Sequence, residues 1–350
     1  MADGEKANVG FSSYLGVGRE STFKTLVTAT AGLDFISASF KTTQEQKVLE
    51  TVSGKRTYAD RMSTSKVVEG EVEFYMAADS DACVHILQNS FGGGNPTTAT
   101  ATGDTVGAGT FEHIFGLNNF DSAYSSLSFN HRKGDAVNGK IFEYNGGRVN
   151  ELTLSGEVDE ALVASASLVL VDSTSTSNNY LSLLAFGGQT PMSFQNMRLS
   201  VESTFASLTA SAFWFVQSFE FGINNGLKSD SDSRRIGTNV LDVLPPGVAN
   251  MTFNFSMRFD TLTAYNAMLN ETQLSAQIAC QGPTMTGSSL RQQILINMPR
   301  IYISDSGDPE VGGPDDILKA EVTAMVLRDD STSTGYAVQA VVRNKTTTYV

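Results

Sequence analysis

The sequence is poor in the residues that usually carry chemistry. Its 350 residues include three His, two Cys and one Trp. Two cysteines, Cys83 and Cys280, cannot build a disulfide framework, so the composition fits a reducing compartment. Catalysis needs a nucleophile beside a base, paired carboxylates in a cleft or a cluster of metal ligands, and no motif has the spacing of such a site. We therefore expect no catalytic residue, no cofactor and no metal.

The three histidines have no common neighbourhood in the sequence. His85 lies in a predicted helix, whereas His113 and His131 flank separate predicted strands. A two-histidine metal site would form if His113 and His131 faced one another, but no third ligand is nearby in sequence. We interpret all three as structural side chains, and both cysteines as small buried hydrophobic residues.

Positive charge and long apolar runs are also scarce. With 24 Lys and Arg against 37 Asp and Glu, the net charge is −13. Proteins that grip nucleic acid need clustered basic residues, so this class is excluded, although a protein that lets DNA pass is not. No stretch approaches 18 apolar residues, and the first residues lack the pattern of a secretion signal. We expect a protein made in the cytoplasm without a membrane insertion.

What the sequence contains in abundance is period-two alternation. Residues 251–259 read MTFNFSMRF, and residues 68–76 alternate in the same way, with apolar residues on one face and polar residues on the other. Such alternation is typical of half-buried β-strands. Similar patterns predict strands at residues 35–40, 127–131, 149–156, 163–171, 213–221, 294–303, 317–327 and 336–342.

Two stretches have a helical pattern, and each follows an alternating strand directly. Residues 79–91 and 260–274 both begin with an Asp that can cap a helix. Because the order of strand, Asp cap and helix occurs twice, the chain was compared with itself. Asp79 and Asp260 differ by 181 positions. The same spacing relates Phe74 to Phe255, Met76 to Met257, Asn89 to Asn270, Phe40 to Phe221 and Ser37 to Ser218.

The repeat predicts two similar domains. Residues 41–66 and 222–247 are equally long polar, strand-poor segments in matching places, and residues 163–177 match residues 321–333. We predict a first domain over residues 1–177, with an N-terminal arm at 1–30, and a second over residues 194–350. Residues 178–193 are the predicted linker, because Ser, Asn and Gly interrupt the strand pattern there.

A row of glutamates marks one face of a predicted strand. Glu69, Glu71 and Glu73 alternate with apolar residues, so neighbouring carboxylates lie about 7 Å apart and repel one another within a Debye length of about 8 Å. One interpretation is a solvated outer face. The other is a wall kept negative so that a passing polyanion does not adhere to it.

Several segments together resemble the major tail tube proteins of long-tailed bacteriophages. They are YLGVGREST at residues 14–22, the strand with its 26-residue excursion, the return strand VVEGEVEF leading into a helix, GTFEHIFGL, and GGRVNELTLSGEVDEALVASASLVL at residues 146–170. The resemblance extends over almost the whole chain. It implies a mainly β fold, a β-sandwich or half-barrel domain with one flanking helix and a long inter-strand loop. Most members of the family carry one such domain, whereas the repeat predicts two in tandem in this chain.

The resemblance also implies roles for particular residues. Subunits of the family join edge to edge, so that an inner β-barrel lines a channel, and a long loop reaches the neighbouring ring. On this basis the lumen-facing residues are Glu69, Glu71, Glu73, Thr252, Asn254 and Ser256. The ring-stacking loops contain Glu45, Lys55, Arg56, Tyr58, Arg61, Arg234, Arg235 and Asp242. Arg258 interrupts the second polar row, and either pairs with a carboxylate such as Asp260 or faces outward.

The implied function is that of a structural, non-enzymatic virion protein. The resemblance implies hexameric rings for tube proteins with one domain. A chain with two domains needs three copies to supply six domains around the channel, so a trimeric, pseudo-hexameric ring is expected. Ring closure covers open sheet edges that would otherwise aggregate, and an open stacking contact makes a filament.

The implied partners are further copies of the chain, DNA and a tape-measure-type protein in transit, a tail terminator, and baseplate or adsorption-end proteins. Two alternatives remain open. One is another β-rich virion component, such as a capsid decoration or baseplate hub protein. The other is a carbohydrate-binding or hydrolytic β-sandwich, although Trp214 lies in the apolar run FWFVQSFEF and is expected in the core or in an interface.

Overall fold

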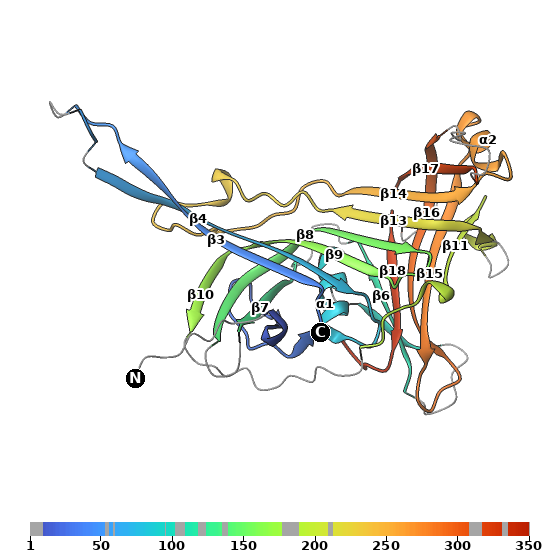
Figure 1. Cartoon of the computed structure of the whole chain (residues 1–350), viewed down its shortest axis with the longest axis horizontal. Coiled ribbons are helices and arrows are strands. Elements are labelled where there is room, and N and C mark those ends of the chain that lie inside the picture. Colours follow the sequence, from blue (N-terminus) through green and yellow to red (C-terminus); the bar gives the residue numbers. More distant parts are fainter. Residues whose placement is uncertain are drawn as a thin grey trace.

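The structure is mainly β, as the alternation predicted. The computed structural model describes residues 10–52, 56–58, 60–94, 96–101, 109–117, 124–134, 139–176, 189–208, 213–307, 317–330 and 335–349. We call residues 10–176 the first half and residues 189–349 the second half. Figure 1 shows strands of both halves side by side across the molecule, and one long hairpin that projects from it.

The first half contributes ten strands and one α-helix to the described part of the chain. Its helix is α1 (Asp81–Ser90), and a short 3-10 helix, η1 (Gly10–Ser12), precedes the first strand. The strands are β1 (Tyr14–Glu20), β2 (Ala31–Leu33), β3 (Ser37–Leu49), β4 (Asp60–Tyr75), β5 (Thr97–Thr100), β6 (Phe111–Gly116), β7 (Ser126–Lys133), β8 (Lys140–Glu157), β9 (Val163–Leu170) and β10 (Asp172–Thr176).

The second half contributes eight described strands and the helix α2 (Thr263–Leu269). Its strands are β11 (Met197–Glu202), β12 (Phe213–Trp214), β13 (Val216–Asn224), β14 (Asn250–Arg258), β15 (Leu274–Thr284), β16 (Arg291–Ser306), β17 (Lys319–Val326) and β18 (Gln339–Asn344). Its 3-10 helices are η2 (Phe194–Asn196), η3 (Phe205–Ser207) and η4 (Ser231–Ser233).

The strand pairings of the first half recur in the second half. Besides β5–β6, which has no counterpart among the described pairs of the second half, the pairs in the first half are β1–β2, β1–β7, β3–β4, β4–β9, β7–β8, β8–β9 and β8–β10. In the second half they are β11–β12, β11–β15, β13–β14, β14–β17, β15–β16, β16–β17 and β16–β18. Each pair is antiparallel, and the two sets follow the same order along the chain.

The registers also correspond. Phe74 lies opposite Ala164, and Phe255 lies opposite Val322. The offset between β4 and β14 is therefore 255 − 74 = 181, and the offset between β9 and β17 is 322 − 164 = 158. The sequence comparison had aligned these segments with the same two offsets. The match of Phe40 with Phe221 was wrong by two residues, because pairing through β4 and β14 places Phe40 in correspondence with Ile223. A shift of two preserves the face of a strand, which is why the sequence pattern did not exclude it.

Eight strands form a continuous central sheet in the order β3-β4-β9-β8-β13-β14-β17-β16. The β8–β13 pair joins the two halves. Strands β8 and β16 are long, and their N-terminal parts leave the central sheet to pair with β7 and β15. Within the described residues, β3 pairs only with β4, and residues 302–306 of β16 pair only with β17. Both outer edges of the central sheet are therefore unpaired.

The core lies on one side of the central sheet and is shared by both halves. A single cluster of buried side chains includes Phe74 and Leu87 of the first half and Phe253 and Ile296 of the second. The end of the chain also packs on the first half, since β18 pairs with β6 and the Tyr349 ring contacts His113. The halves thus fold as parts of one body.

Both predicted helices exist, with different ends. The α1 helix is capped by Ser80, whose hydroxyl accepts the Cys83 N–H at 3.4 Å, rather than by Asp79. The α2 helix is shorter than predicted, because Glu271 adopts a left-handed conformation with φ 47 and Leu274 already begins β15.

Two predicted segments differ from the structure, and a third is mostly outside the described residues. Residues 41–66 are not strand-poor, because β3 continues to Leu49 and β4 begins at Asp60. The predicted N-terminal arm contains the buried strand β1. The predicted first domain ends with β10, and most of the predicted linker, residues 178–193, lies outside the described residues.

Candidate functional site: a polar sheet face and a projecting hairpin

The central sheet has a second face that turns away from the core, which we call the open face. In β4 the residues Val68, Val72 and Phe74 are buried, whereas Glu69 and Glu71 are exposed and Glu73 is half-buried. The predicted glutamate row therefore lies on the open face, as period two requires. The Glu73 carboxylate also accepts a hydrogen bond from the Ser37 hydroxyl at 3.3 Å.

Carboxylates extend over the open face far beyond β4. Strand register places further acidic residues on it, which the sequence analysis missed: Glu151 and Glu157 of β8, Glu220 of β13, Asp305 of β16 and Glu321 of β17. The exposed basic residues that register places there are Lys41, Arg258 and Lys319, whereas Arg148, opposite Val169, is buried. Eight carboxylates against three exposed cations leave this face with a local charge of 3 − 8 = −5.

The other predicted lumen-facing residues lie on the same face. Thr252 is exposed, and Asn254 is half-buried. Ser256 is on the open face as well but is only 5% exposed, since it lies between Ser218 and Glu321 on the neighbouring strands. Arg258 is exposed, so its side chain meets solvent at the end of β14.

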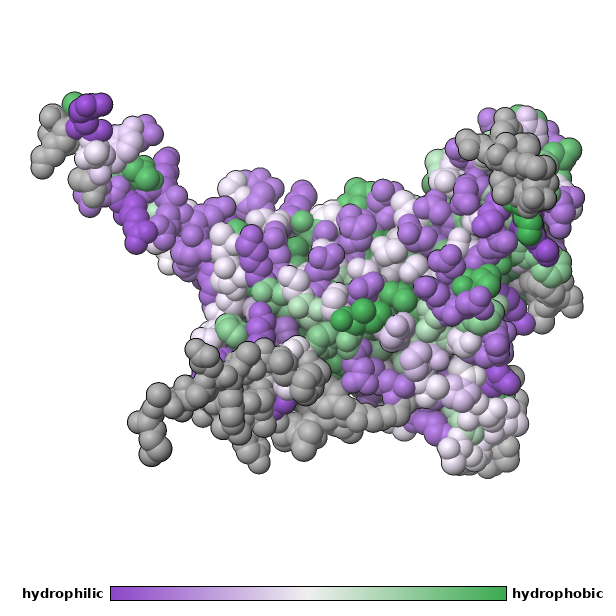
Figure 2. All heavy atoms as spheres, in the orientation of Figure 1, coloured by the Kyte–Doolittle hydropathy of each residue, from purple (hydrophilic) through white to green (hydrophobic). Residues whose placement is uncertain are grey.

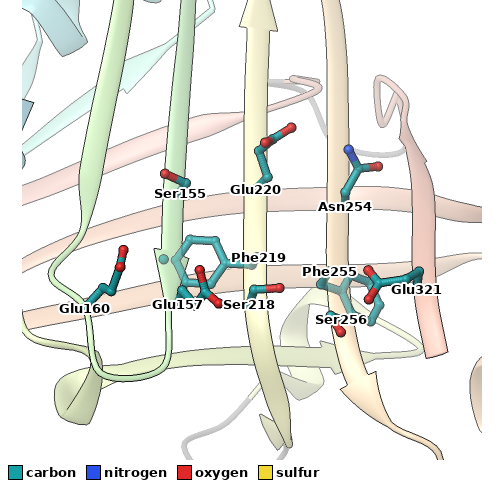
Figure 3. Close-up of a pocket in the computed structure, with 11 residues that line it drawn as sticks. Ser155, Glu157, Glu160, Ser218, Phe219, Glu220, Asn254, Phe255, Ser256 and Glu321 are labelled. Atoms are coloured by element: carbon teal, nitrogen blue, oxygen red, sulfur yellow. The ribbon is translucent and has the colours of Figure 1, made fainter. Parts of the chain in front are cut away.

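A hollow of about 300 Å³ lies on the open face where the two halves meet. Figure 3 shows Glu157, Glu160, Glu220 and Glu321 around it, from elements of both halves. The two aromatic residues that border it, Phe219 and Phe255, are 5% and 2% exposed. Trp214 is half-buried and packs edge to face on Phe255 at 5.8 Å between centroids. The hollow therefore has no exposed aromatic platform for a sugar.

The β3–β4 hairpin projects beyond the body of the molecule, and we call its outer part, residues 41–66, the arm (Figure 1). Figure 2 shows the arm as a narrow, largely hydrophilic extension. Glu45 and Arg61 make cross-strand hydrogen bonds with Ser65 and Gln46. Arg56 and Tyr58 are exposed, and Lys55 lies outside the described residues. The arm holds six Lys or Arg and three acidic residues, a net charge of 6 − 3 = +3 within a chain of −13.

Apolar side chains are exposed along the same arm. Val48 is 48% exposed, Tyr58 62% and Met62 47%, and Val52 is fully exposed. A projecting hairpin cannot bury these residues against its own chain. These side chains therefore stay exposed in the single chain.

The matching segment of the second half, residues 222–247, follows a different path, and we call it the second loop. Leu241 and Leu244 are 2% and 1% exposed and pack with Val171 of the first half. The Asp242 carboxylate pairs with Lys24 at 3.2 Å and with Arg235 at 3.5 Å. These contacts hold the second loop against its own chain.

The second loop also supports the base of the arm. The Lys66 N–H donates to the Asn239 carbonyl at 2.8 Å, and the Arg234 guanidinium donates to the Lys66 carbonyl at 3.3 Å. Thus the structure brings Arg234, Arg235 and Asp242 to the foot of the arm, whereas Glu45, Arg56, Tyr58 and Arg61 lie on the arm itself.

The histidines and cysteines occupy structural positions. His113 bonds Thr98 at 3.0 Å and the Thr346 carbonyl at 2.8 Å, while His131 packs on Phe40. Burial lowers the pKa of all three histidines, that of His131 to about 4. Burial raises the pKa of Cys83 to about 11 and that of Cys280 to about 12, so both remain thiols. No three potential ligands converge on a metal position in the part of the chain that the structure describes.

Comparisons with known proteins agree with this geometry. The family model described as "Phage tail tube protein" matches residues 10–326. The comparison with curated proteins finds no match. Among the described helices, none has the length and apolar character needed to cross a membrane. Members of the matched family are structural components of the virion tail, not enzymes. With the match covering most of its length, the chain belongs to the phage tail tube protein family.

Proposed function

We propose that this chain is the major tube subunit, that three copies form each ring, and that stacked rings make the conduit through which DNA leaves the virion. The observation that carries this proposal is the central sheet. It is continuous across both halves, carries net negative charge on its open face and, among the described residues, has one edge without a strand partner on each side. An open sheet edge on each side can pair with another copy of the chain, and a negative face that lines the channel repels DNA.

The repeated strand pairings support two tandem domains that arose by duplication. Both halves contribute four strands to the central sheet in the same relative order, and the equivalent helices follow equivalent strands. Because each chain then supplies two similar units, three chains supply six and close a pseudo-hexameric ring. Cyclic closure leaves no edge strand open to nonspecific pairing.

The dimensions of such a ring suit a conduit. Three copies contribute 3 × 8 = 24 strands, and at about 4.8 Å per strand the circumference is about 115 Å. The corresponding diameter is about 37 Å before strand tilt widens it. Barrels with 16 to 18 strands already enclose an aqueous channel, so a barrel of this size leaves a wide lumen.

The open face provides the chemistry that a conduit for DNA requires. Phosphate groups bind to clustered Lys and Arg, and here carboxylates on five strands outnumber the three cations. In the ring this face lines the bore, with Glu69, Glu71, Glu73, Thr252, Asn254 and Ser256 among its residues. Repulsion keeps a passing polyanion, or a tape-measure-type protein of suitable charge, from adhering to the wall.

The arm is assigned to ring stacking, with Glu45, Lys55, Arg56, Tyr58 and Arg61 in the contact. The opposite end of the central sheet carries exposed apolar residues that we assign as its receiving surface: Ile36 (45%), Tyr75 (46%), Val158 (48%), Phe215 (63%) and Ile317 (66%). Asp34, Asp159 and Asp260 are exposed near the same strand ends, which suits an arm of net positive charge. A contact between opposite ends of one subunit is open and generates a filament.

Arg234, Arg235 and Asp242 act in this proposal through the arm. They hold its base, as their hydrogen bonds and ion pairs within the chain indicate. At its two ends the tube meets other virion proteins, a tail terminator on one side and baseplate or adsorption-end proteins on the other.

The test is replacement of Glu69, Glu71 and Glu73 by Lys in phage particles and in purified protein. Because the three residues lie on the open face away from the core, we expect wild-type hollow tubes with threefold rings in electron micrographs, while DNA delivery falls at least tenfold. Replacement by Gln, which removes charge without reversing it, should have a smaller effect. Failure of the Lys variant to assemble would place the row in an interface, and wild-type protein that forms only discrete closed particles would refute the tube.

A further inference from the structure

The junction between the two halves is an observed example of pairing between two similar units. Residues 151–157 of β8 pair antiparallel with residues 218–224 of β13, with Thr153 opposite Gly222 and Ser155 opposite Glu220. On the core side of the junction, Leu152 lies opposite Ile223 and Leu154 opposite Phe221. Apolar residues therefore face apolar residues below the sheet, and polar residues meet on the open face.

The unpaired edges of the central sheet are the counterparts of the two strands in this junction. In the repeated pairings β3 corresponds to β13, and β16 corresponds to β8. In β8 the pairing with β7 ends at Gly147 and the pairing with β13 begins at Glu151. In β16 the pairing with β15 ends at Ile301, and the edge beyond it is unpaired within the described residues. The unpaired segment of β16 is thus the one that would hold the next unit.

Correspondence through shared neighbours fixes the residues. Thr153 lies opposite Ser165, and Asp305 lies opposite Thr323, where 323 − 165 = 158 is the offset between β9 and β17. Asp305 is therefore the counterpart of Thr153. Gly222 lies opposite Thr252 and Ser39 opposite Glu71, so Ser39 is the counterpart of Gly222.

This inference rests on the ring proposed above. We propose that β16 of one copy pairs antiparallel with β3 of the next copy, in the register that β8 and β13 have within one chain. In this register Asp305 lies opposite Ser39, Ser306 opposite Ala38 and Gly307 opposite Ser37. The partner of this sheet edge is thus a second copy of the same chain, held as the second half holds the first.

The chemistry of the two edges fits this register. By the same correspondence Ile303 is the counterpart of Leu152 and Phe40 that of Ile223, so the two buried side chains meet on the core side, with the register shift of β16 between Ile303 and Asp305 beside them. On the open face, Lys41 is placed beside Tyr302 and diagonally from Asp305, so opposite charges become cross-strand neighbours. A slip of one residue would turn the Phe40 side of β3 toward the bore, which the burial of apolar surface opposes.

The two edges cannot pair within one chain. Seven inter-strand steps separate β3 from β16 in the central sheet. At about 4.8 Å per step, the two strands lie about 34 Å apart along the sheet. Any bond between Ser39 and Asp305 positions therefore joins two copies.

The experiment is a disulfide cross-link in the assembled protein with the double variant Ser39→Cys and Asp305→Cys. Directly opposed residues of antiparallel strands have Cα atoms about 4.5 to 5.5 Å apart, within the range that a disulfide spans. Both positions are exposed, and the native Cys83 and Cys280 are buried. We expect dimers and trimers on a nonreducing gel, with no larger species, after mild oxidation of tubes.

The matched control is Ser37→Cys with Tyr302→Cys, which uses the same two edges about four residues, or about 13 Å, out of register. The test pair should cross-link at least tenfold more than this control. Equal cross-linking of both pairs, or none for the test pair in samples where tubes are seen, would overturn the proposed register while leaving the tube intact. Wild-type protein that makes neither rings nor tubes would instead refute the proposed function.

A second measurement covers the case in which the double variant fails to assemble. Protein with only Ser39→Cys is mixed with protein with only Asp305→Cys, assembled and oxidised. Each junction then holds at most one matched pair, so covalent dimers of mixed composition support the register. Tubes from this mixture that yield only monomers contradict it.

Discussion

The arm and the second loop occupy matching places in the two halves, yet they are built differently. Through the registers with β4 and β14, the 26 residues of the arm correspond to residues 224–247, which are 24 residues of the second loop. The arm continues both of its strands and projects with exposed apolar residues, whereas the second loop folds onto the first half and buries Leu241 and Leu244. In the proposed tube, therefore, one segment per chain serves stacking rather than two. Because a ring has three chains, the contacts between rings follow threefold symmetry.

The composition of the two segments explains the difference. The arm contains β-branched residues and lacks Pro, so strand pairing can continue. The second loop contains Pro245 and Pro246, which supply no N–H for a ladder, and Asp230, whose side chain caps η4. Its leucines then bury apolar surface where strand pairing has ended.

Removal of the arm should have the largest effect. Gln46 lies opposite Ser63, so replacement of residues 47–62 by Asn-Gly closes the hairpin with a two-residue turn. We expect rings that do not stack, and at least a tenfold loss of sedimentable tubes, because the proposed stacking surface is absent. Electron microscopy and sedimentation measure both outcomes.

A milder pair of variants controls for this deletion. Val48→Ser with Met62→Ser changes exposed residues of the arm, and Ile236→Ser with Val248→Ser changes exposed residues in and beside the second loop. Only the arm variant should weaken stacking. Normal tubes after the deletion, or equal losses for both double variants, would show that the two segments do not differ in this role.

Loss of the buried leucines should have the next largest effect. It should lower the stability of the folded chain and leave the stacking surface of the arm unchanged. Leu241 and Leu244 are buried in a small cluster, so Leu241→Ala with Leu244→Ala should lower the free energy of unfolding by about 4 kcal/mol, at the low end for buried leucines. Urea unfolding measures the change. Val243→Ala, at a 49% exposed neighbour, should stay within about 0.5 kcal/mol; equal changes would mean that the second loop is not anchored by its leucines.

The base of the arm should respond to pH with a smaller effect. His131 packs on Phe40, and burial lowers its pKa to about 4, below its usual 6.5. Between these values the unfolded chain binds more protons, so stability falls as pH decreases from 6.5 toward 4, by at most about 1.4 kcal/mol per pH unit for this group. Urea midpoints for wild type and His131→Phe should converge near pH 7 and separate toward pH 4.5, with the variant less sensitive. Parallel curves would contradict this role.

The sequence predicted much of the central sheet but only part of its open face. Glu69, Glu71 and Glu73 were found because they alternate with apolar residues within one strand. Glu220 was missed because it stands alone in an apolar run, and only pairing with β8 and β14 places it beside other carboxylates. The sequence did carry a signal for Glu321, because β17 reads KAEVTAMV and every second residue of it is buried in the structure.

The paths of the two long segments could not be predicted from their own residues. Leu241 and Leu244 look like any apolar residues in a loop, and their partner Val171 lies about 70 positions away. Likewise, the extension of β3 and β4 depends on pairing between strands that are each too polar to be recognised alone.

The sequence by itself determined the period-two strands, the two helices and the repeat, because these depend on the spacing of apolar residues along the chain. Tertiary structure alone decided that β8 joins β13, that carboxylates from five strands gather on one face, and that only the first of two matching segments projects. These features depend on which edges meet across long sequence separations, and the chemistry of one strand does not specify its neighbour.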